Sequence, residues 1–169
     1  MTRTGFIGLG SNVGNRLSNL RRAVKLLSST EGIEVTLKSP IYETTPVEVA
    51  SEQEDYLNQV IAIESGLSPM HLRQVCLDIE SELGRNIEHG SGLPRTIDLD
   101  IISLGDLVGE FEKIKLPHPR YSGRQFVLQP LADIAPHFSD PATGRNVIYM
   151  LGNCAADGIR AYPVEEVTV

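Results

Sequence analysis

Two periods of apolar residues alternate along the chain, and together they predict a mixed fold. Short apolar runs, continuous or alternating with polar residues, predict strands at 4–9, 35–42, 56–64 and 96–104. Between them, apolar residues recur at helical spacing after Arg16 and after Ser68-Pro69, a pair typical of a helix start. The order β-α-β-β-α-β is the split βαβ arrangement of a ferredoxin-like α+β domain. Two helices are expected to cover one face of the sheet, leaving the other face for loops and ligand.

Smaller elements are expected outside this core. A short hairpin is predicted near 108–116, and short closing helices are predicted at 126–134 and 146–151. Thr44 is expected to open a polar, acidic loop that runs through Asp55. No repeat, low-complexity tract or linker divides the chain, so residues 1–169 are expected to form a single domain.

The Gly-rich segment 8–14 joins the first strand to the first helix. Its spacing fits neither the dinucleotide fingerprint nor the Walker pattern, so a phosphate-binding loop is a weak hypothesis. A tight strand-to-helix turn that needs small residues is the better explanation.

Composition narrows the possible partners and location. A net charge of −7 and a pI near 5.1 argue against nucleic acid, because a phosphate-backbone binder normally has a basic face. Cys76 and Cys154 have no metal-ligand spacing, and Cys76 falls on an apolar helical stripe. Neither a secretory leader nor a long apolar segment is evident, so a soluble cytoplasmic protein without a membrane partner is expected.

Candidate chemistry centres on the predicted strand at 96–104. In a strand, Asp98 and Asp100 share one face, roughly 7 Å apart at Cα, while Ile97, Leu99 and Ile101 share the other. Two like charges at this distance favour a cation between them, and Mg²⁺ bound to a phosphate-bearing substrate is the obvious candidate. A strand with one solvated face is the more frequent explanation of Asp-x-Asp by spacing alone.

Cationic residues lie on both sides of this strand in sequence. Arg85 and Arg95 bracket the preceding loop, and guanidinium groups neutralise phosphate charge with fixed geometry. The segment 113–124 contains Lys113, Lys115, Arg120 and Arg124 without an acidic residue, which suits a polyphosphate. His118, between two prolines, either braces its turn or contacts a ligand.

Six short segments make the chain resemble a known family. They are residues 8–12, 56–58, 84–85, 92–101, 116–120 and 126–131, in order and with compatible spacing from about Gly5 to Pro136. The combination of Pro-Arg-Thr-x-Asp-Leu-Asp-Ile with Leu-Pro-His-Pro-Arg is highly specific. Together they resemble 6-hydroxymethyl-7,8-dihydropterin pyrophosphokinases of folate biosynthesis. The resemblance implies transfer of the β,γ-pyrophosphoryl unit of ATP to the pterin hydroxymethyl group, with release of AMP.

The resemblance also implies roles for individual residues. Asp98 and Asp100 would hold two Mg²⁺ ions, and Arg85 and Arg95 would stabilise the charge that moves. The implied pterin contacts are Thr44, Thr45, Val47, Tyr56, Asn58 and Phe126. The implied ATP contacts are Glu80, Arg95, Ile101, Lys113, His118 and Arg124. The expected partners are these two small molecules, and the expected oligomeric state is a monomer or weak homodimer.

The loop 86–94 departs from the family pattern. This loop is usually richer in Arg and contains a Trp, whereas the chain has no Trp and carries Gly90 and Gly92 here. Thr45 also stands where the family commonly has Pro. Weaker nucleotide affinity or a less populated closed state is therefore predicted. Two alternatives remain open: a non-catalytic relative that binds pterin or nucleotide, and an interaction module whose Asp-x-Asp is only an exposed strand face.

Overall fold

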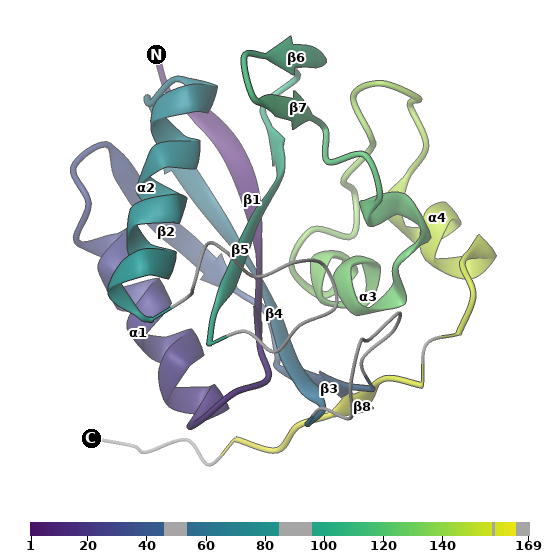
Figure 1. Ribbon diagram of the computed structural model, residues 1–169. Coiled ribbons are helices and arrows are strands. Elements are labelled where there is room, and N and C mark those ends of the chain that lie inside the picture. The colour runs from purple at the N-terminus through teal and green to yellow at the C-terminus, as the bar shows by residue number, and fades with distance from the viewer. Residues whose placement is uncertain (46–53, 85–95, 157, 165–169) are drawn as a thin grey trace.

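The computed structural model describes residues 1–45, 54–84, 96–156 and 158–164 (Figure 1). In chain order the elements are β1 (Arg3–Ser11), α1 (Arg16–Ser28), β2 (Ile33–Lys38), β3 (Tyr42–Thr44), β4 (Tyr56–Ser65), α2 (Pro69–Glu82), β5 (Asp98–Leu104), β6 (Gly109–Phe111), β7 (Ile114–Leu116), a 3-10 turn η1 (Tyr121–Gly123), α3 (Gln125–Ile134), α4 (Val147–Asn153) and β8 (Arg160–Ala161). The predicted core order, the hairpin and both closing helices are confirmed.

The main sheet is antiparallel, and β1 lies inside it between β5 and β4. The order is β5-β1-β4-β3-β8, and β2 pairs with β4 next to β3. In this order each β-α-β crossover passes over one strand: α1 leads from β1 to β2 on the far side of β4, and α2 leads from β4 to β5 on the far side of β1. The ferredoxin-like α+β class is therefore confirmed, and β6 and β7 form a separate hairpin.

Helices α1 and α2 cover one face of this sheet (Figure 1). Both begin where predicted: the Asn15 side chain accepts a hydrogen bond from the Ser18 amide, and the Ser68 side chain accepts one from the His71 amide. Their apolar stripes pack against alternate residues of β1, including Ile7 and Leu9, in one continuous core. Cys76 is buried in this core, as predicted.

Helices α3 and α4 pack on the opposite face, which corrects one prediction. Phe6, Val60 and Ile102 lie in a second buried cluster with residues of these helices such as Leu128 and Leu131. The prediction that this face is left for loops and ligand is therefore wrong for half of it. The amphipathic α3 supplies an apolar stripe that has to be buried, and the apolar residues of this face bury it (Figure 1).

The strand predicted at 35–42 is two strands. Pro40 has no amide hydrogen to donate, and the Ser39 hydroxyl accepts the hydrogen bond from the Val60 amide in the interval. Pairing with β4 resumes at Tyr42 and continues through Thr44, which lies opposite Tyr56. Thr44 is thus a strand residue, not the start of the loop as predicted, because β4 offers it a pairing partner. The short edge strand β8 was not predicted.

Candidate active site

On the second face of the sheet, buried apolar residues are followed along the strands by glycines and polar residues. Beyond the cluster under α3 and α4, it continues with a set of residues that we call the polar half-face: Gly8, Gly10, Tyr56, Asn58, Asp98 and Asp100. Gly8 pairs with Asp100 and Val60, and Gly10 pairs with Asp98 and Asn58. Cross-strand partners share a face, so two aspartates stand on one side of β1 and an asparagine and a tyrosine on the other.

Glycines separate the two sides of the polar half-face. Gly8 and Gly10 lie inside β1, so the prediction that they form a tight turn is wrong. The turn comes later and uses Gly14, whose φ of +70° favours glycine. A Cβ atom on Gly10 would lie 3.3 Å from Asn58 Oδ1 and 3.5 Å from Tyr56 Cδ1. The missing side chains therefore leave backbone as the surface between the aspartates and Asn58.

Asp98 and Asp100 are both half-buried, and a third carboxylate lies near their backbone. The Leu99 amide donates a hydrogen bond to Glu80 Oε2 at 3.4 Å, and the Glu80 side chain on α2 is buried. Within the described ranges, no group of three or more His, Cys, Asp or Glu side chains forms a ready metal site. Asp98 and Asp100 are a pair of carboxylates on one face of β5, and carboxylate oxygens are ligands that Mg²⁺ prefers.

The turn that contains His118 lies beside β5. The His118 amide donates a hydrogen bond to the Ile102 carbonyl at 2.8 Å, and His118 Nδ1 accepts one from the Arg120 amide at 3.1 Å. Burial, followed by the nearby Arg124 and Arg120, lowers the pKa of His118 to about 4, and Asp98 opposes this shift. The imidazole is therefore neutral near pH 7. Because Nδ1 is the acceptor, Nε2 carries the proton.

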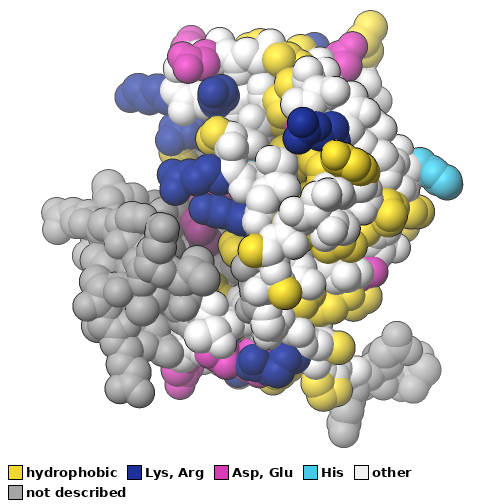
Figure 2. Space-filling model, turned by 90° about the vertical axis from the view of Figure 1, so that its right-hand side faces the viewer, with side chains coloured by type: hydrophobic (Ala, Val, Ile, Leu, Met, Phe, Trp, Pro, Cys, Tyr) yellow, Lys and Arg dark blue, Asp and Glu magenta, His cyan; other side chains and the backbone are white. Residues whose placement is uncertain are grey.

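The cations of 113–124 cluster as the sequence suggests. Lys113, Lys115 and Arg120 are exposed, while Arg124 is half-buried with its guanidinium carbon 5.6 Å from the centre of the Phe126 ring. Figure 2 shows Lys and Arg side chains gathered along one side of the face that α3 and α4 present. These residues lie on the segment between β5 and α3, which also contains the turn of His118.

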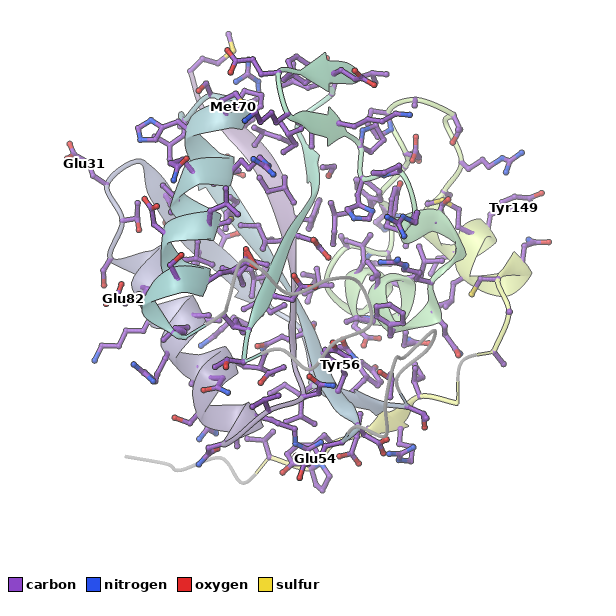
Figure 3. The ribbon with its side chains drawn as sticks, in the orientation of Figure 1. Glu31, Glu54, Tyr56, Met70, Glu82 and Tyr149 are labelled. Carbon is purple, nitrogen blue, oxygen red and sulfur yellow. The ribbon has the colours of Figure 1, made fainter. Side chains whose placement is uncertain are left out.

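Three of the residues expected to bind pterin, Thr44, Tyr56 and Asn58, lie on β3 and β4, on the other side of β1. Thr44 and Asn58 are both buried, and Asn58 Nδ2 donates a hydrogen bond to Thr44 Oγ1 at 2.7 Å. Tyr56 is half-buried at the start of β4, and Figure 3 places it with Glu54 at the same end of the sheet. Phe126 is half-buried in the first turn of α3, and Thr45 is exposed.

Four expected site residues need separate mention. Arg85, Arg95 and Val47 lie outside the described residues, as does the loop 86–94. The Ile101 side chain packs into the core under α1 and α2, on the face opposite Asp98 and Asp100. Its backbone, not its side chain, is the part that borders the polar half-face.

A network of charged residues lies beside Thr44, Tyr56 and Asn58, which we call the pterin-side residues. The sequence did not predict this network. Arg16 Nη1 is 2.6 Å from Glu43 Oε2 and donates to the Asp55 carbonyl at 2.9 Å. Arg160 Nη2 is 3.0 Å from Glu43 Oε1 and 2.6 Å from Asp55 Oδ2. The hydrogen bond from Arg16 lowers the pKa of Glu43 despite its partial burial, and Arg160 lowers it further. These residues are far apart in sequence and follow no periodicity, so no pattern could reveal them.

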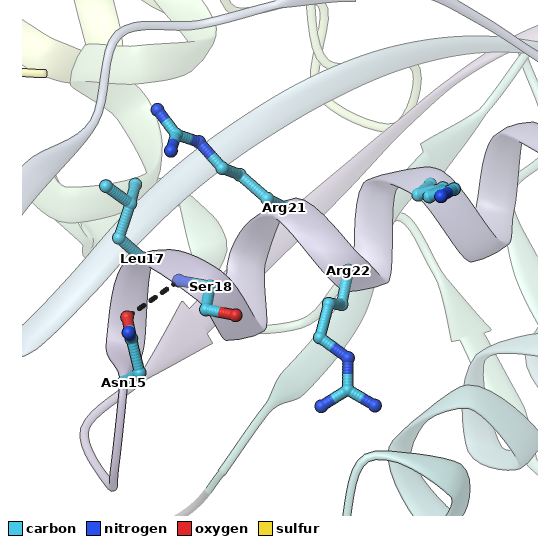
Figure 4. Close-up of a pocket in the computed structure, with 6 residues that line it drawn as sticks. Asn15, Leu17, Ser18, Arg21 and Arg22 are labelled. Carbon is cyan, nitrogen blue, oxygen red and sulfur yellow. Dashed lines mark hydrogen bonds between the residues drawn. The ribbon is translucent and has the colours of Figure 1, made fainter. Parts of the chain in front are cut away.

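A separate surface pocket of about 310 Å³ lies along α1 (Figure 4). It is lined by Asn15, Leu17, Ser18, Arg21, Arg22 and Lys25. Since α1 covers the first face of the sheet, this pocket is not part of the polar half-face. Arg21 and Arg22 point away from each other in Figure 4, so they do not converge on a common ligand position.

Comparisons with known proteins identify related sequences. The model of a family described as 7,8-dihydro-6-hydroxymethylpterin-pyrophosphokinase (HPPK) matches residues 6–136. A Bacillus subtilis protein named 2-amino-4-hydroxy-6-hydroxymethyldihydropteridine pyrophosphokinase is 43% identical over 143 residues, which cover 85% of this chain and 84% of the relative. The Synechocystis protein of the same name is 40% identical over 145 residues, covering 86% and 73%.

Longer relatives and solved structures match over only part of their length. The folic acid synthesis protein fol1 of Schizosaccharomyces pombe is 38% identical over 157 residues, which are 93% of this chain but 21% of that protein. A crystal structure of HPPK-DHPS in complex with substrates superposes with a TM-score of 0.70 at 10% identity, covering 89% of this chain and 43% of that one. At this identity the superposition supports the fold alone. No helix among the described residues has the length and apolar character needed to cross a membrane.

Proposed function

Because the chain belongs to the 7,8-dihydro-6-hydroxymethylpterin-pyrophosphokinase family, we propose that its polar half-face brings ATP and a reduced pterin together. The enzyme is an ATP-dependent diphosphotransferase of folate biosynthesis. The pterin hydroxyl oxygen attacks the β-phosphorus, the bond from that phosphorus to the oxygen bridging to the α-phosphate breaks, and AMP leaves. The hydroxyl proton is released. The observation that supports this assignment best is the pairing of Gly8 and Gly10 with Asp100 and Asp98 on one side and with Val60 and Asn58 on the other.

Asp98 and Asp100 are proposed to hold the magnesium ions, two in number, that accompany ATP. Carboxylate oxygens are ligands that Mg²⁺ prefers, and phosphate oxygens together with water would complete its coordination. Both carboxylates are fixed on β5, a strand paired along its length with β1. Such ions neutralise charge on the triphosphate and on the attacking oxygen. Arg85 and Arg95 are assigned to the same charge on the strength of the family resemblance.

ATP is proposed to lie between β5 and the segment 113–126. Lys113 and Arg124 supply positive charge for the phosphates, and neutral His118 offers its Nε2 proton as a hydrogen-bond donor. The buried Glu80, which accepts a hydrogen bond from the Leu99 amide of β5, is assigned to the nucleotide. The backbone of Ile101, within β5, is assigned to it as well. A neutral imidazole is suitable here because Arg120 and Arg124 already supply the nearby charge.

The pterin is proposed to lie on the other side of β1, against Asn58. An amide offers a donor and an acceptor to the edge of a heterocycle, and the hydrogen bond to Thr44 fixes the orientation of this amide. Tyr56 and Phe126 offer aromatic faces for a flat ring. Thr45 and Val47 complete the proposed contacts.

The experiment is to incubate the protein with ATP, Mg²⁺ and 6-hydroxymethyl-7,8-dihydropterin and to measure AMP and pyrophosphorylated pterin. Equal amounts of both products are expected. Asp98→Asn should lower the rate at least about 100-fold, since charge stabilisation of this kind is a large contribution to catalysis. Asp106→Asn, an exposed aspartate beyond the other end of β5, is the matched control. Binding of both substrates without AMP formation by the wild-type protein would contradict the proposal.

The wider setting of the protein is also proposed. ATP and the reduced pterin are its partners, it acts in the cytoplasm as a single domain, and it is a monomer or a weak homodimer. Light scattering across a concentration series tests the last statement.

A further inference from the structure

A short C-terminal arm, residues 158–164, crosses the end of the sheet at which the pterin-side residues lie. Its strand β8 pairs with β3, and the Tyr162 amide donates a hydrogen bond to the Ile41 carbonyl at 2.9 Å. The Tyr162 ring lies 5.8 Å from the guanidinium carbon of Arg16, at the start of α1. Figure 1 shows the arm passing from the α4 side of the sheet, along β3, to the α1 side. The arm lies outside the matched range of the family, which ends at residue 136.

Arg160, in this arm, contacts one residue on each side of the segment that connects β3 to β4; we call these two sides the stems of the connection. Its Nη2 atom lies 3.0 Å from Glu43 Oε1 and 2.6 Å from Asp55 Oδ2. Glu43 immediately precedes Thr44, and Asp55 immediately precedes Tyr56. Thr44 and Tyr56 are cross-strand partners, so one guanidinium holds the residues next to both members of this pair.

The geometry points to Arg160 as a positioning residue for the pterin side of the site. We propose that it sets the spacing of the two stems and thereby the position of the Thr44 hydroxyl, Asn58 and Tyr56. This inference rests on the proposed placement of the pterin against Asn58. Arg160 belongs to a different element from these residues and acts through Glu43 and Asp55.

The ion pairs of Arg160 are exposed, so replacing Arg160 should have only a small effect on global stability. The Arg160 side chain is 49% exposed, and exposed ion pairs contribute little to global stability. The unfolding transition should therefore change little when Arg160 is replaced. Binding geometry is more sensitive, because an error of well under 1 Å in a hydrogen-bonding group lowers its complementarity to a rigid ligand. The predicted signature is a change in pterin affinity without a matching change in ATP affinity.

The test compares Arg160→Met, Arg160→Lys and Arg145→Met for the KM of each substrate. Arg145 is exposed and lies in the turn between α3 and α4, where its backbone bonds to Asp140 and Thr143, so its variant is the matched control. Arg160→Met should raise the pterin KM roughly three- to ten-fold and leave the ATP KM within about two-fold. Arg160→Lys should recover part of this loss, because an ammonium can pair with one carboxylate at a time. Glu43→Gln in a protein with Arg160 intact should reproduce the loss.

Salt supplies an independent readout. Raising the ionic strength screens the exposed ion pairs, so the pterin KM of the wild-type protein should approach that of Arg160→Met, while that of the variant changes less. An unchanged pterin KM in Arg160→Met, or an equal rise in both KM values, overturns the inference.

A further variant, Asn58→Ala, tests the proposed placement of the pterin independently of the role of Arg160. Asn58→Ala should raise the pterin KM whether or not Arg160 has the proposed role. A normal pterin KM in Asn58→Ala contradicts the placement of the pterin itself. A raised value there, combined with no effect in Arg160→Met, contradicts only the role of Arg160.

Discussion

Gly10→Ala adds a single methyl group to the surface between the aspartates and Asn58. The new Cβ would lie 3.3 Å from Asn58 Oδ1, closer than most real contacts of this kind, so the amide must shift by a few tenths of an ångström. Asn58 cannot shift freely, because its amide nitrogen is bonded to Thr44 Oγ1 at 2.7 Å. The substitution therefore acts on the orientation of the amide that we assign to the pterin.

Opposing contributions keep the effect on stability small. Alanine restricts the unfolded chain and favours the folded state by about 0.4–1 kcal/mol where the backbone conformation suits it. A weakened hydrogen bond between Asn58 and Thr44 offsets this by about 0.5–1.5 kcal/mol. The free energy of unfolding should consequently stay within about 1 kcal/mol of the wild-type value.

For the free energy of pterin binding, no opposing contribution offsets the loss. A misplaced amide leaves donor and acceptor groups of the ligand or of Asn58 unsatisfied, at about 1–3 kcal/mol. This corresponds to an increase in the pterin Kd of about 5- to 150-fold. Calorimetric titration with the pterin gives the Kd, and urea denaturation gives the free energy of unfolding.

Gly152→Ala provides the control for the same chemical change. Gly152 lies in α4, and no atom lies within 4 Å of the position its Cβ would take. Its variant should keep the wild-type pterin Kd and gain up to about 1 kcal/mol of stability. If Gly10→Ala binds the pterin as tightly as the wild-type protein does, Asn58 is not the pterin contact and the reasoning fails.

Three further outcomes follow from the structure. The native pKa of His118, about 4, lies below its unfolded value near 6.5, so its contribution to stability is complete above pH 6.5 and is lost as the pH falls towards 4; urea denaturation at several pH values should show a smaller loss in His118→Gln, and an equal loss would contradict the assignment. Leu131→Ala, at a fully buried site of α3, should cost about 2–5 kcal/mol of unfolding free energy, and a cost below about 1 kcal/mol would contradict the tight packing. Replacing Lys113 and Lys115 together by Gln should raise the KM of ATP and weaken its dependence on salt, whereas an unchanged dependence would separate this patch from the phosphates.

The fold followed from the sequence where periodicity is strong. The apolar stripes of α1 and α2 and their Asn15 and Ser68 caps determine both helices, because each cap satisfies a backbone amide locally. The break between β2 and β3 was missed, since the Ser39 hydroxyl replaces a backbone partner only in the context of β4. Strand β8 has no apolar pattern at all and pairs through the backbone.

The candidate site was predictable in its chemistry but not in its arrangement. The spacing of Asp98 and Asp100 indicates a shared face, and the family resemblance assigns a ligand to it. The role of Gly8 and Gly10 could not be derived from spacing, because a glycine in a turn and a glycine beneath a ligand look alike until the strand partners are known. The same holds for Arg160, whose partners Glu43 and Asp55 are brought near it only by the assembled sheet.

The position of β1 between β4 and β5 also has a consequence for folding kinetics. Gly10 pairs with Asn58 on one side and Asp98 on the other, so the polar half-face requires two pairings between distant parts of the chain. Such non-local pairing is slow, because the entropy of closing long loops is lost before the contacts form. A folding chain can complete α1 or α2 early and still lack the polar half-face. Binding of a substrate should therefore appear only in the last folding phase, at the same rate as protection of the β1–β5 amides from hydrogen exchange.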